Sequence, residues 1–239
     1  MIDVILRKYF KDLMKNSDYP KDRRMRVIED VGIEGLSSEN IRFVINELVR
    51  RYAGTYLEVG TYKGCSLISA ALYNNKVTCI GIDNFSEFAE GVQHPYKIIM
   101  DNAAKVSCDN IKMFVGDYHN VIPDLEDFLG KLEIDVYMYD GNHNYESQLE
   151  GLNIILPYLN YRCVIIVDDA AWPEPHRANM DWLENNMDFD TILLSNYSPE
   201  EWEDGDEKFK QSVVNNKKWW NGLRIFWRGI DEYETDNWF

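Results

Sequence analysis

Two acidic motifs, 28 residues apart, are the part of this sequence best suited to chemistry. The first is DGNHNY at residues 140–145, and the second begins with Asp168 and Asp169. Each follows a short apolar run typical of a buried strand. If the two strands are neighbours in a sheet, their ends lie about 5 Å apart, and the carboxylates of Asp140, Asp168 and Asp169 converge.

Converging carboxylates raise one another's pKa unless they share a proton, meet a basic side chain or bind a metal ion. Neither motif contains Lys or Arg. A set of oxygen ligands favours a hard divalent cation such as Mg²⁺ over zinc. The alternative is that Asp168 or Asp169 caps the next helix and Asp140 serves a turn. We favour the metal site because the two motifs occur together.

His143 is the candidate for proton transfer, because the ordinary pKa of histidine, near 6.5, suits a general base at neutral pH. It lies three residues after Asp140. A lone histidine is more often structural, so its place in the motif carries the catalytic interpretation. Tyr145 and Trp172 could wall a pocket here or serve as packing.

A glycine-bearing turn lies at the start of the predicted sheet. It reads EVGTYKG at residues 58–64 and stands between a predicted strand and a helical run. Such a turn lets the backbone approach a ligand closely, and the following helix start presents free N–H groups. A dinucleotide-binding turn would have glycine where this chain has Glu58, and a carboxylate there disfavours a pyrophosphate. The turn therefore suits a cationic or hydroxyl-rich ligand.

Acidic residues also follow the next two predicted strands. Asp83 comes 23 residues after Gly60, and Asp117 follows Gly116 at the end of the third strand. An acidic residue after a strand is often a helix N-cap. Several of them at the carboxyl ends of successive strands indicate instead a ligand at that edge of the sheet.

These motifs resemble, in order, the S-adenosylmethionine site of class I methyltransferases. The resemblance covers residues 55 to about 228. It implies that the glycine turn approaches the methionine part of the donor, that Asp83 holds the ribose and that Asp117 lies against the adenine. The implied donor site consists of Glu58, Gly60, Thr61, Tyr62, Gly64, Ser66, Asp83, Asp117 and Asp140.

The pattern DGxHxY followed by DD resembles the macrocin and mycinamicin type of sugar O-methyltransferases. By this resemblance Asp140, Asp168 and Asp169 are the metal ligands, and Asp140 and His143 are the catalytic residues, with His143 as the base. Before the fifth strand these enzymes usually carry Gly-Gly, whereas this chain has NYRC at 160–163. The Trp-rich segment 219–221 also has no counterpart in the family pattern, and it borders the expected acceptor side.

Short apolar runs alternate with helical patterns from residue 55 onward, which is typical of repeated βα units. The predicted fold class is α/β, a Rossmann-like three-layer sandwich whose seven-stranded sheet is mostly parallel and has an antiparallel last strand. A helix is expected near 176–187. The expected strands are 55–59, 77–82, 111–115, 134–139, 163–167, 190–195 and 222–227.

Residues 1–50 contain no convincing strand and are predicted to be a helical lead-in to a methyltransferase domain at 51–239. Ser37 and Ser38 can cap a helix in this lead-in. Residues 181–207 carry ten acidic residues and no Lys or Arg. The segment 196–210 is therefore predicted to be a solvated loop, either an acidic insertion or a substrate lid. The tail at 231–239 is expected to fray.

Composition excludes several classes of partner. The chain has 239 residues, with 25 Lys and Arg against 41 Asp and Glu, and a net charge of −16. This charge makes nucleic acid and anionic membrane poor partners. The sequence lacks a membrane-spanning run and a secretion signal, and its four cysteines occur singly, so we expect reduced thiols and a cytoplasmic protein.

The expected function is O-methylation of a small-molecule hydroxyl acceptor with S-adenosylmethionine and Mg²⁺ as cofactors. A diol-bearing sugar or glycosylated natural product is favoured, and a catechol-like acceptor comes next. The alternatives are an NAD(P)-dependent oxidoreductase, against which Glu58 argues, a metal-dependent hydroxylase resembling the cephalosporin hydroxylase group, and a non-catalytic S-adenosylmethionine-binding protein. The helical lead-in could form a homo-oligomer interface.

Overall fold

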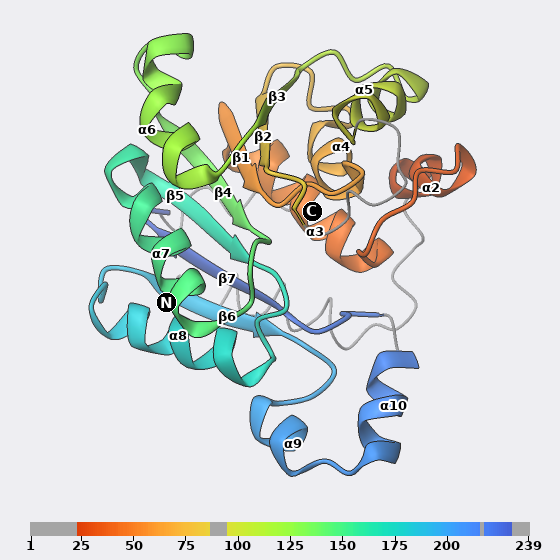
Figure 1. Cartoon of the computed structure of the whole chain (residues 1–239), viewed down its shortest axis with the longest axis vertical. Helices are drawn as coiled ribbons and strands as arrows, with labels where there is room; N and C mark the ends of the chain where they lie inside the picture. The colour runs from red at the N-terminus through yellow and green to blue at the C-terminus, as the bar shows by residue number, and fades with distance from the viewer. Residues whose placement is uncertain (1–22, 87–94, 216–217, 231–239) are drawn as a thin grey trace.

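The computed structural model describes residues 23–86, 95–215 and 218–230. The predictions for residues 1–22 and for the tail lie outside these ranges. The helices and strands are, in chain order, α2 (Arg23–Asp30), α3 (Glu39–Tyr52), β1 (Thr55–Val59), α4 (Cys65–Ala71), β2 (Thr78–Asp83), α5 (Pro95–Lys105), β3 (Ile111–Val115), α6 (Tyr118–Leu129), β4 (Ile134–Tyr139), α7 (Tyr145–Ile155), the 3₁₀ helix η1 (Leu156–Tyr158), β5 (Leu159–Val167), α8 (Pro173–Glu184), β6 (Asp190–Leu194), α9 (Pro199–Asp204), α10 (Glu207–Asn215) and β7 (Leu223–Arg228) (Figure 1).

The strands form one sheet in the order β3-β2-β1-β4-β5-β7-β6. The strands β1 to β5 pair in parallel, and β7 runs antiparallel to both β5 and β6. The predicted fold class is confirmed, and each predicted strand is present with small changes of bounds. The largest change is in β5, which begins at Leu159. Its first four residues are half-buried or exposed, so the search for an apolar run found only its buried half.

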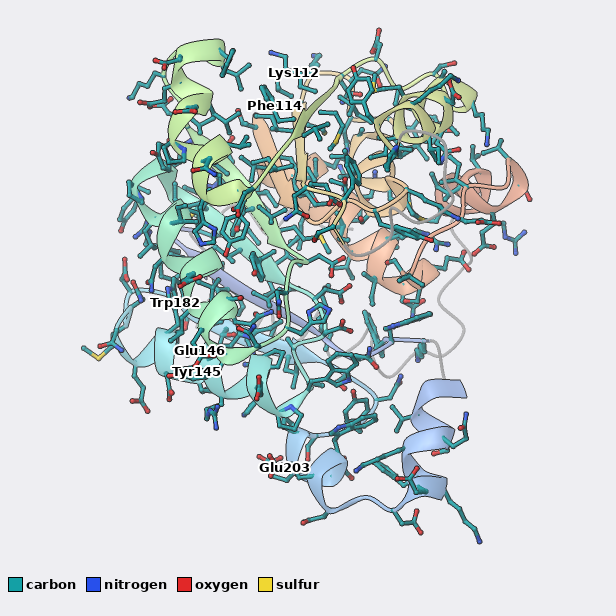
Figure 2. All side chains as sticks on the ribbon, in the orientation of Figure 1. Lys112, Phe114, Tyr145, Glu146, Trp182 and Glu203 are labelled. Carbon is teal, nitrogen blue, oxygen red and sulfur yellow. The ribbon has the colours of Figure 1, made fainter. Side chains whose placement is uncertain are left out.

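Helices cover both faces of the sheet, which explains the continuous apolar runs in its central strands (Figure 1). One face packs against α2, α3, α4 and α5, and the other against α6, α7 and α8. Successive residues of β5 point to opposite layers, Val164 to the first and Ile165 to the second. On the second face lies Trp182 of α8, which Figure 2 labels. Its ring centre is 5.0 Å from that of Phe226 in β7.

The predicted helix of the lead-in is α3. Ser38 is its N-cap, and its Oγ accepts a hydrogen bond from the N–H of Ile41 at 3.2 Å. The same hydroxyl donates to the carbonyl of Lys218 at 2.7 Å, which ties the lead-in to the turn before β7. All five residues of the expected apolar face are buried, namely Ile41, Val44, Ile45, Leu48 and Val49. The domain boundary between residues 50 and 51 stays a prediction.

The prediction of a loop at 196–210 is wrong, because the segment contains α9 and the start of α10. Ser198 and Glu201 form a capping box, with Pro199 at the first helical position. Trp202 and Phe209 pack against the buried ring of Tyr197, at centroid distances of 5.3 and 6.4 Å. The acidic side chains of this segment face outward. Counting its charges therefore indicated only its exposed side and missed the apolar side that packs inward.

Within the described residues, no helix combines the length and the apolar character that crossing a bilayer requires. The four cysteines are buried and unpaired, as expected.

Candidate active site

The two acidic motifs meet at the carboxyl edge of the sheet. β4 and β5 pair in parallel with Tyr139 opposite Val167, so Asp140 and Asp168 leave the sheet side by side. The N–H of Asp168 donates to the carbonyl of Tyr139 at 3.2 Å and continues the strand pairing into the loop. The predicted adjacency of the two strands is therefore confirmed.

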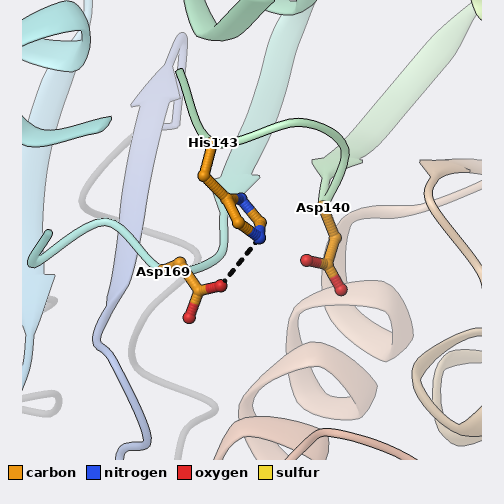
Figure 3. Close-up of side chains that lie close together, drawn as sticks. All are labelled: Asp140, His143 and Asp169. Atoms are coloured by element: carbon orange, nitrogen blue, oxygen red, sulfur yellow. Dashed lines mark ion pairs between the residues drawn. The ribbon is translucent and has the colours of Figure 1, made fainter. Parts of the chain in front are cut away.

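Asp140, His143 and Asp169 each place one possible ligand atom within 4.8 Å of the others (Figure 3). Nε2 of His143 lies 3.0 Å from Oδ2 of Asp169. The imidazole also contacts the ring of Trp172, edge-on at a centroid distance of 5.4 Å. These contacts hold the histidine ring next to the acidic cluster, which consists of Asp140, Asp168 and Asp169.

Asp168 is not one of the three residues whose ligand atoms lie within 4.8 Å of one another. The residue is 4% exposed, and its Oδ1 has no hydrogen-bond partner within the described part of the chain. A buried carboxylate oxygen without a partner is costly unless a cation or a proton compensates it. Its position fits a ligand atom for a metal ion.

The carboxylates of Asp140, Asp168 and Asp169 repel one another. Burial raises the pKa of Asp140 well above its usual range, and the charges of Asp168 and Asp169 raise it further. Burial and the charge of Asp169 raise the pKa of Asp168 to about 8, against the opposing effects of the Asp169 N–H and His143. A divalent cation would reverse these shifts.

The cluster opens into a cavity of about 410 Å³, the size of a small-ligand site. None of the described residues that line it is Lys or Arg. The cavity reaches from the acidic cluster to the glycine turn, so the two parts of the predicted site share one space. The predicted residues that line it are Gly60, Thr61, Tyr62, Ser66, Asp83, Asp140, His143, Asp168 and Asp169.

The glycine turn packs directly on the first acidic motif. Gly60 has a φ of +86°, and a Cβ on it would lie 1.9 Å from the carbonyl oxygen of Asp140, so only glycine fits. Asp83 fixes the turn, because its Oδ2 accepts hydrogen bonds from the N–H groups of Thr61 and Tyr62 at 2.7 and 2.8 Å. Asp83 thus shapes the turn as well as facing the cavity, where its predicted contact with the ribose stays a prediction.

Glu58 does not line the cavity but supports the turn from behind. Its side chain is fully buried and accepts hydrogen bonds from the hydroxyls of Tyr56 at 2.6 Å and Ser66 at 2.7 Å. Burial raises the pKa of Glu58 to about 7, against these two hydrogen bonds, which favour the charged form. Ser66 does line the cavity, so its hydroxyl connects the buried carboxylate of Glu58 to the cavity wall.

Asp117 and Gly64 also lie outside the cavity lining. Asp117 is the N-cap of α6, where its Oδ1 accepts from the N–H of His119 at 2.9 Å, while its neighbours Gly116 and Tyr118 face the cavity. Gly64 stands at the start of α4. The predicted contact between Asp117 and the adenine stays a prediction.

Of the two aromatic residues named as pocket walls, Trp172 lines the cavity and Tyr145 does not. The hydroxyl of Tyr145 donates to Asp181 at 2.7 Å, and the guanidinium of Arg177 lies 4.6 Å from its ring centre. Tyr145 therefore joins α7 to α8 at the end of the acidic motif (Figure 2).

Several lining residues were not predicted from the sequence. They are Gly35, Leu36 and Ser37 of the lead-in, Asn84 and Phe85 after β2, and Trp220 and Asn221 before β7. No local sequence pattern marks the lead-in residues as part of a site, because their position depends on how α3 packs. For Trp220 and Asn221, the unusual Trp219-Trp220-Asn221 sequence was the pattern that could have indicated a site.

Part of the chain matches a known protein family. Residues 57–170 match the family model described as a methyltransferase domain. An uncharacterized protein of Acanthamoeba polyphaga mimivirus is 29% identical over 116 residues, which is 48% of this chain and 51% of that protein. The chain thus matches about half the length of this curated relative.

Solved O-methyltransferase structures share the fold. TomG of Streptomyces achromogenes, in complex with S-adenosylmethionine, has a TM-score of 0.58 at 16% identity, covering 89% of this chain and 91% of that one. A putative caffeoyl-CoA O-methyltransferase of Staphylococcus aureus has a TM-score of 0.57 at 14% identity, covering 94% and 100%. CalS11, a TDP-rhamnose 3′-O-methyltransferase of calicheamicin biosynthesis, has a TM-score of 0.56 at 16% identity, covering 80% and 88%. Residues 57–170 therefore resemble a methyltransferase domain, and the chain shares the fold of these solved O-methyltransferases.

Proposed function

We propose that the protein is an S-adenosylmethionine-dependent and divalent-metal-dependent O-methyltransferase that acts on a small acceptor with adjacent hydroxyls. One observation carries this proposal: the glycine turn and the acidic cluster line the same cavity of about 410 Å³. The methyltransferase-domain match over residues 57–170 supports the donor, and the oxygen of Asp168 that has no partner among the described residues supports the metal.

The residues around the glycine turn would bind the donor. When bound, S-adenosylmethionine supplies an activated methyl group on a sulfonium, so the protein's task is alignment. The backbone of Gly60, Thr61 and Tyr62, held by Asp83, forms one wall of the space. Phe85 and Tyr118 offer aromatic surfaces farther along the cavity, where a flat base would pack.

The acidic cluster would hold the metal through Asp140, Asp168 and Asp169. A divalent cation, when bound, lowers the pKa of a coordinated hydroxyl and fixes its position. The orphaned oxygen of Asp168 and the absence of Lys and Arg from the described lining both fit such a cation. S-adenosylmethionine is itself cationic at sulfur, so the same carboxylates favour it over an anionic cofactor.

His143 would accept the proton of the acceptor hydroxyl. Its Nε2 faces the cluster, 3.0 Å from Asp169, and Trp172 supports the ring. The same atom is also close enough to act as a metal ligand, and one nitrogen cannot serve both roles at once. We assign it to proton transfer because three carboxylates already provide a hard ligand set.

The acceptor is proposed to be a sugar hydroxyl, with a catechol-like diol as the close rival. The DGxHxY motif favours a sugar, and one structural neighbour is a TDP-rhamnose methyltransferase. Trp172 and Trp220 both line the cavity and provide flat apolar surfaces, on which a sugar ring or an aromatic ring packs.

The test is a methylation assay with radiolabelled S-adenosylmethionine and a panel of free sugars, glycosides and catechols, run with MgCl₂ and with EDTA. We expect transfer that EDTA abolishes and MgCl₂ restores. A thermal-shift comparison of S-adenosylhomocysteine with NAD accompanies it. Stabilisation by NAD alone would contradict the proposal, and transfer that is insensitive to EDTA would contradict its metal.

A further inference from the structure

The loop that follows β5 is bonded directly to the turn that precedes β7. The N–H of Ala170 donates to the carbonyl of Gly222 at 3.0 Å, and the N–H of Ala171 donates to that of Asn221 at 2.9 Å. Gly222 has a φ of +91°, and a Cβ there would lie 2.7 Å from that of Ala171, so glycine permits this close approach. The two segments therefore form one wall of the cavity.

Both segments contain a non-glycine residue in the left-handed backbone region. The φ of Asp169 is +51°, and that of Trp220 is +49°. Such residues cost about 1–3 kcal/mol each and persist where their surroundings hold them, commonly at functional sites. Here they lie on facing loops and both line the cavity.

The side chain of Asn221 completes the contact between the loops. Its Nδ2 donates to Oδ1 of Asp169 at 2.6 Å. The other carboxylate oxygen, Oδ2, is the one that lies 3.0 Å from His143. The amide thus occupies one oxygen of Asp169 and leaves the other directed at the cluster. Because an amide is uncharged, it orients this carboxylate without neutralising it.

We propose that Asn221 is a positioning residue that holds Asp169 in the orientation needed for metal binding. The inference rests on the proposed metal site and extends it to a residue outside the family's acidic motifs. A hydrogen bond that orients a ligating carboxylate typically changes metal affinity by about 10–100-fold when it is removed. The direction of the Asp169 side chain depends on a backbone conformation that few residues adopt. This carboxylate therefore needs a second group to hold it in place.

The experiment is calorimetric titration of the full-length protein with MgCl₂, in the presence of saturating S-adenosylhomocysteine. Asn221→Ala should raise the Kd for Mg²⁺ by about 10–100-fold, while the Kd for S-adenosylhomocysteine stays at the wild-type value. Asn221→Gln keeps an amide donor and should recover part of the loss.

The chain offers a matched control. Asn160 Nδ2 donates to Asp135 Oδ1, also at 2.6 Å, at the opposite end of β4 and β5. Asn160→Ala removes the same kind of bond away from the cavity, so Mg²⁺ binding should not change.

The outcomes separate this inference from the proposed function. Wild-type affinity for Mg²⁺ in Asn221→Ala would overturn the role of Asn221 alone. Parallel losses of Mg²⁺ and S-adenosylhomocysteine binding, in both Asn221 variants, would show a general structural role and overturn it as well. A wild-type protein that binds S-adenosylhomocysteine but no Mg²⁺ would refute the proposed metal site itself.

Discussion

At the scale of single residues, the buried carboxylate of Asp168 disfavours folding unless a proton or a cation compensates it. Its buried Oδ1 has no partner in the described chain, and burial with the charge of Asp169 raises its pKa to about 8. Asp168→Asn should therefore raise the melting temperature in EDTA while lowering turnover by at least about 100-fold through loss of the metal. Calorimetry and steady-state assays measure the two effects. A variant that is less stable in EDTA and equally active would contradict the assignment.

His143 is the residue whose two roles can be separated. His143→Gln should lower kcat by about 10²–10⁴-fold, the usual contribution of a general base, and leave Mg²⁺ affinity unchanged. Titration with MgCl₂ provides the second measurement. If Mg²⁺ binding falls as far as it does in Asp168→Asn, then the histidine is a ligand and the proton goes elsewhere.

Glu58 gives the protein a pH-dependent stability. Burial raises its pKa from 4.5 to about 7 in the folded state, so its contribution is fully present below pH 4.5 and is lost as pH rises through 7. The loss is about 3 kcal/mol. Glu58→Gln removes this ionisation, so chemical denaturation at pH 5 and pH 8 should show a smaller decline in the variant. An identical decline in both proteins would show that Glu58 does not titrate in this range.

At the scale of elements, the glycine turn is built against the first acidic motif. Gly60→Ala places a Cβ 1.9 Å from the carbonyl oxygen of Asp140 at a φ of +86°. Gly32 is the control, because its φ is +69° and no atom of the described residues lies within 4 Å of an added Cβ. Both substitutions incur a backbone cost of about 1–3 kcal/mol. Only Gly60→Ala should lose more stability than that and weaken S-adenosylhomocysteine binding, and equal denaturation midpoints would contradict the packing described.

Local patterns in the sequence predict the elements well where burial and period agree. The central strands were identified because both of their faces are covered, and α3 because its cap and apolar face coincide. The helices α9 and α10 were missed because their acidic side concealed a capping box and the aromatic contacts of Tyr197. The acidic motifs could be predicted because each directly follows its own strand. The position of Asn221 beside Asp169 could not be predicted, because it depends on the antiparallel pairing of β7 with β5.

At the scale of the whole molecule, the lead-in and the last hairpin meet across 180 residues at Ser38. Ser38→Ala removes both the N-cap bond to Ile41 and the bond to Lys218, each worth about 1 kcal/mol. Ser198→Ala is the comparison, because Ser198 caps α9 in the same way and, among the described residues, its hydroxyl donates to no distant carbonyl. Urea denaturation should show the larger loss for Ser38→Ala. Equal losses would mean that the long-range bond adds nothing.

The strand order has a consequence for how such a protein can diversify. The strands β1 and β4 are adjacent at the middle of the sheet, with β2 and β3 on one side of them and β5, β7 and β6 on the other. The turn at Gly60 therefore belongs to one half of the sheet, and the acidic cluster with Asn221 belongs to the other half. The backbone packing of Gly60 on Asp140 joins the halves at the cavity. Under the proposed function, substitutions in the β6–β7 hairpin would therefore alter which molecule is methylated while the half proposed to receive the methyl donor is inherited intact.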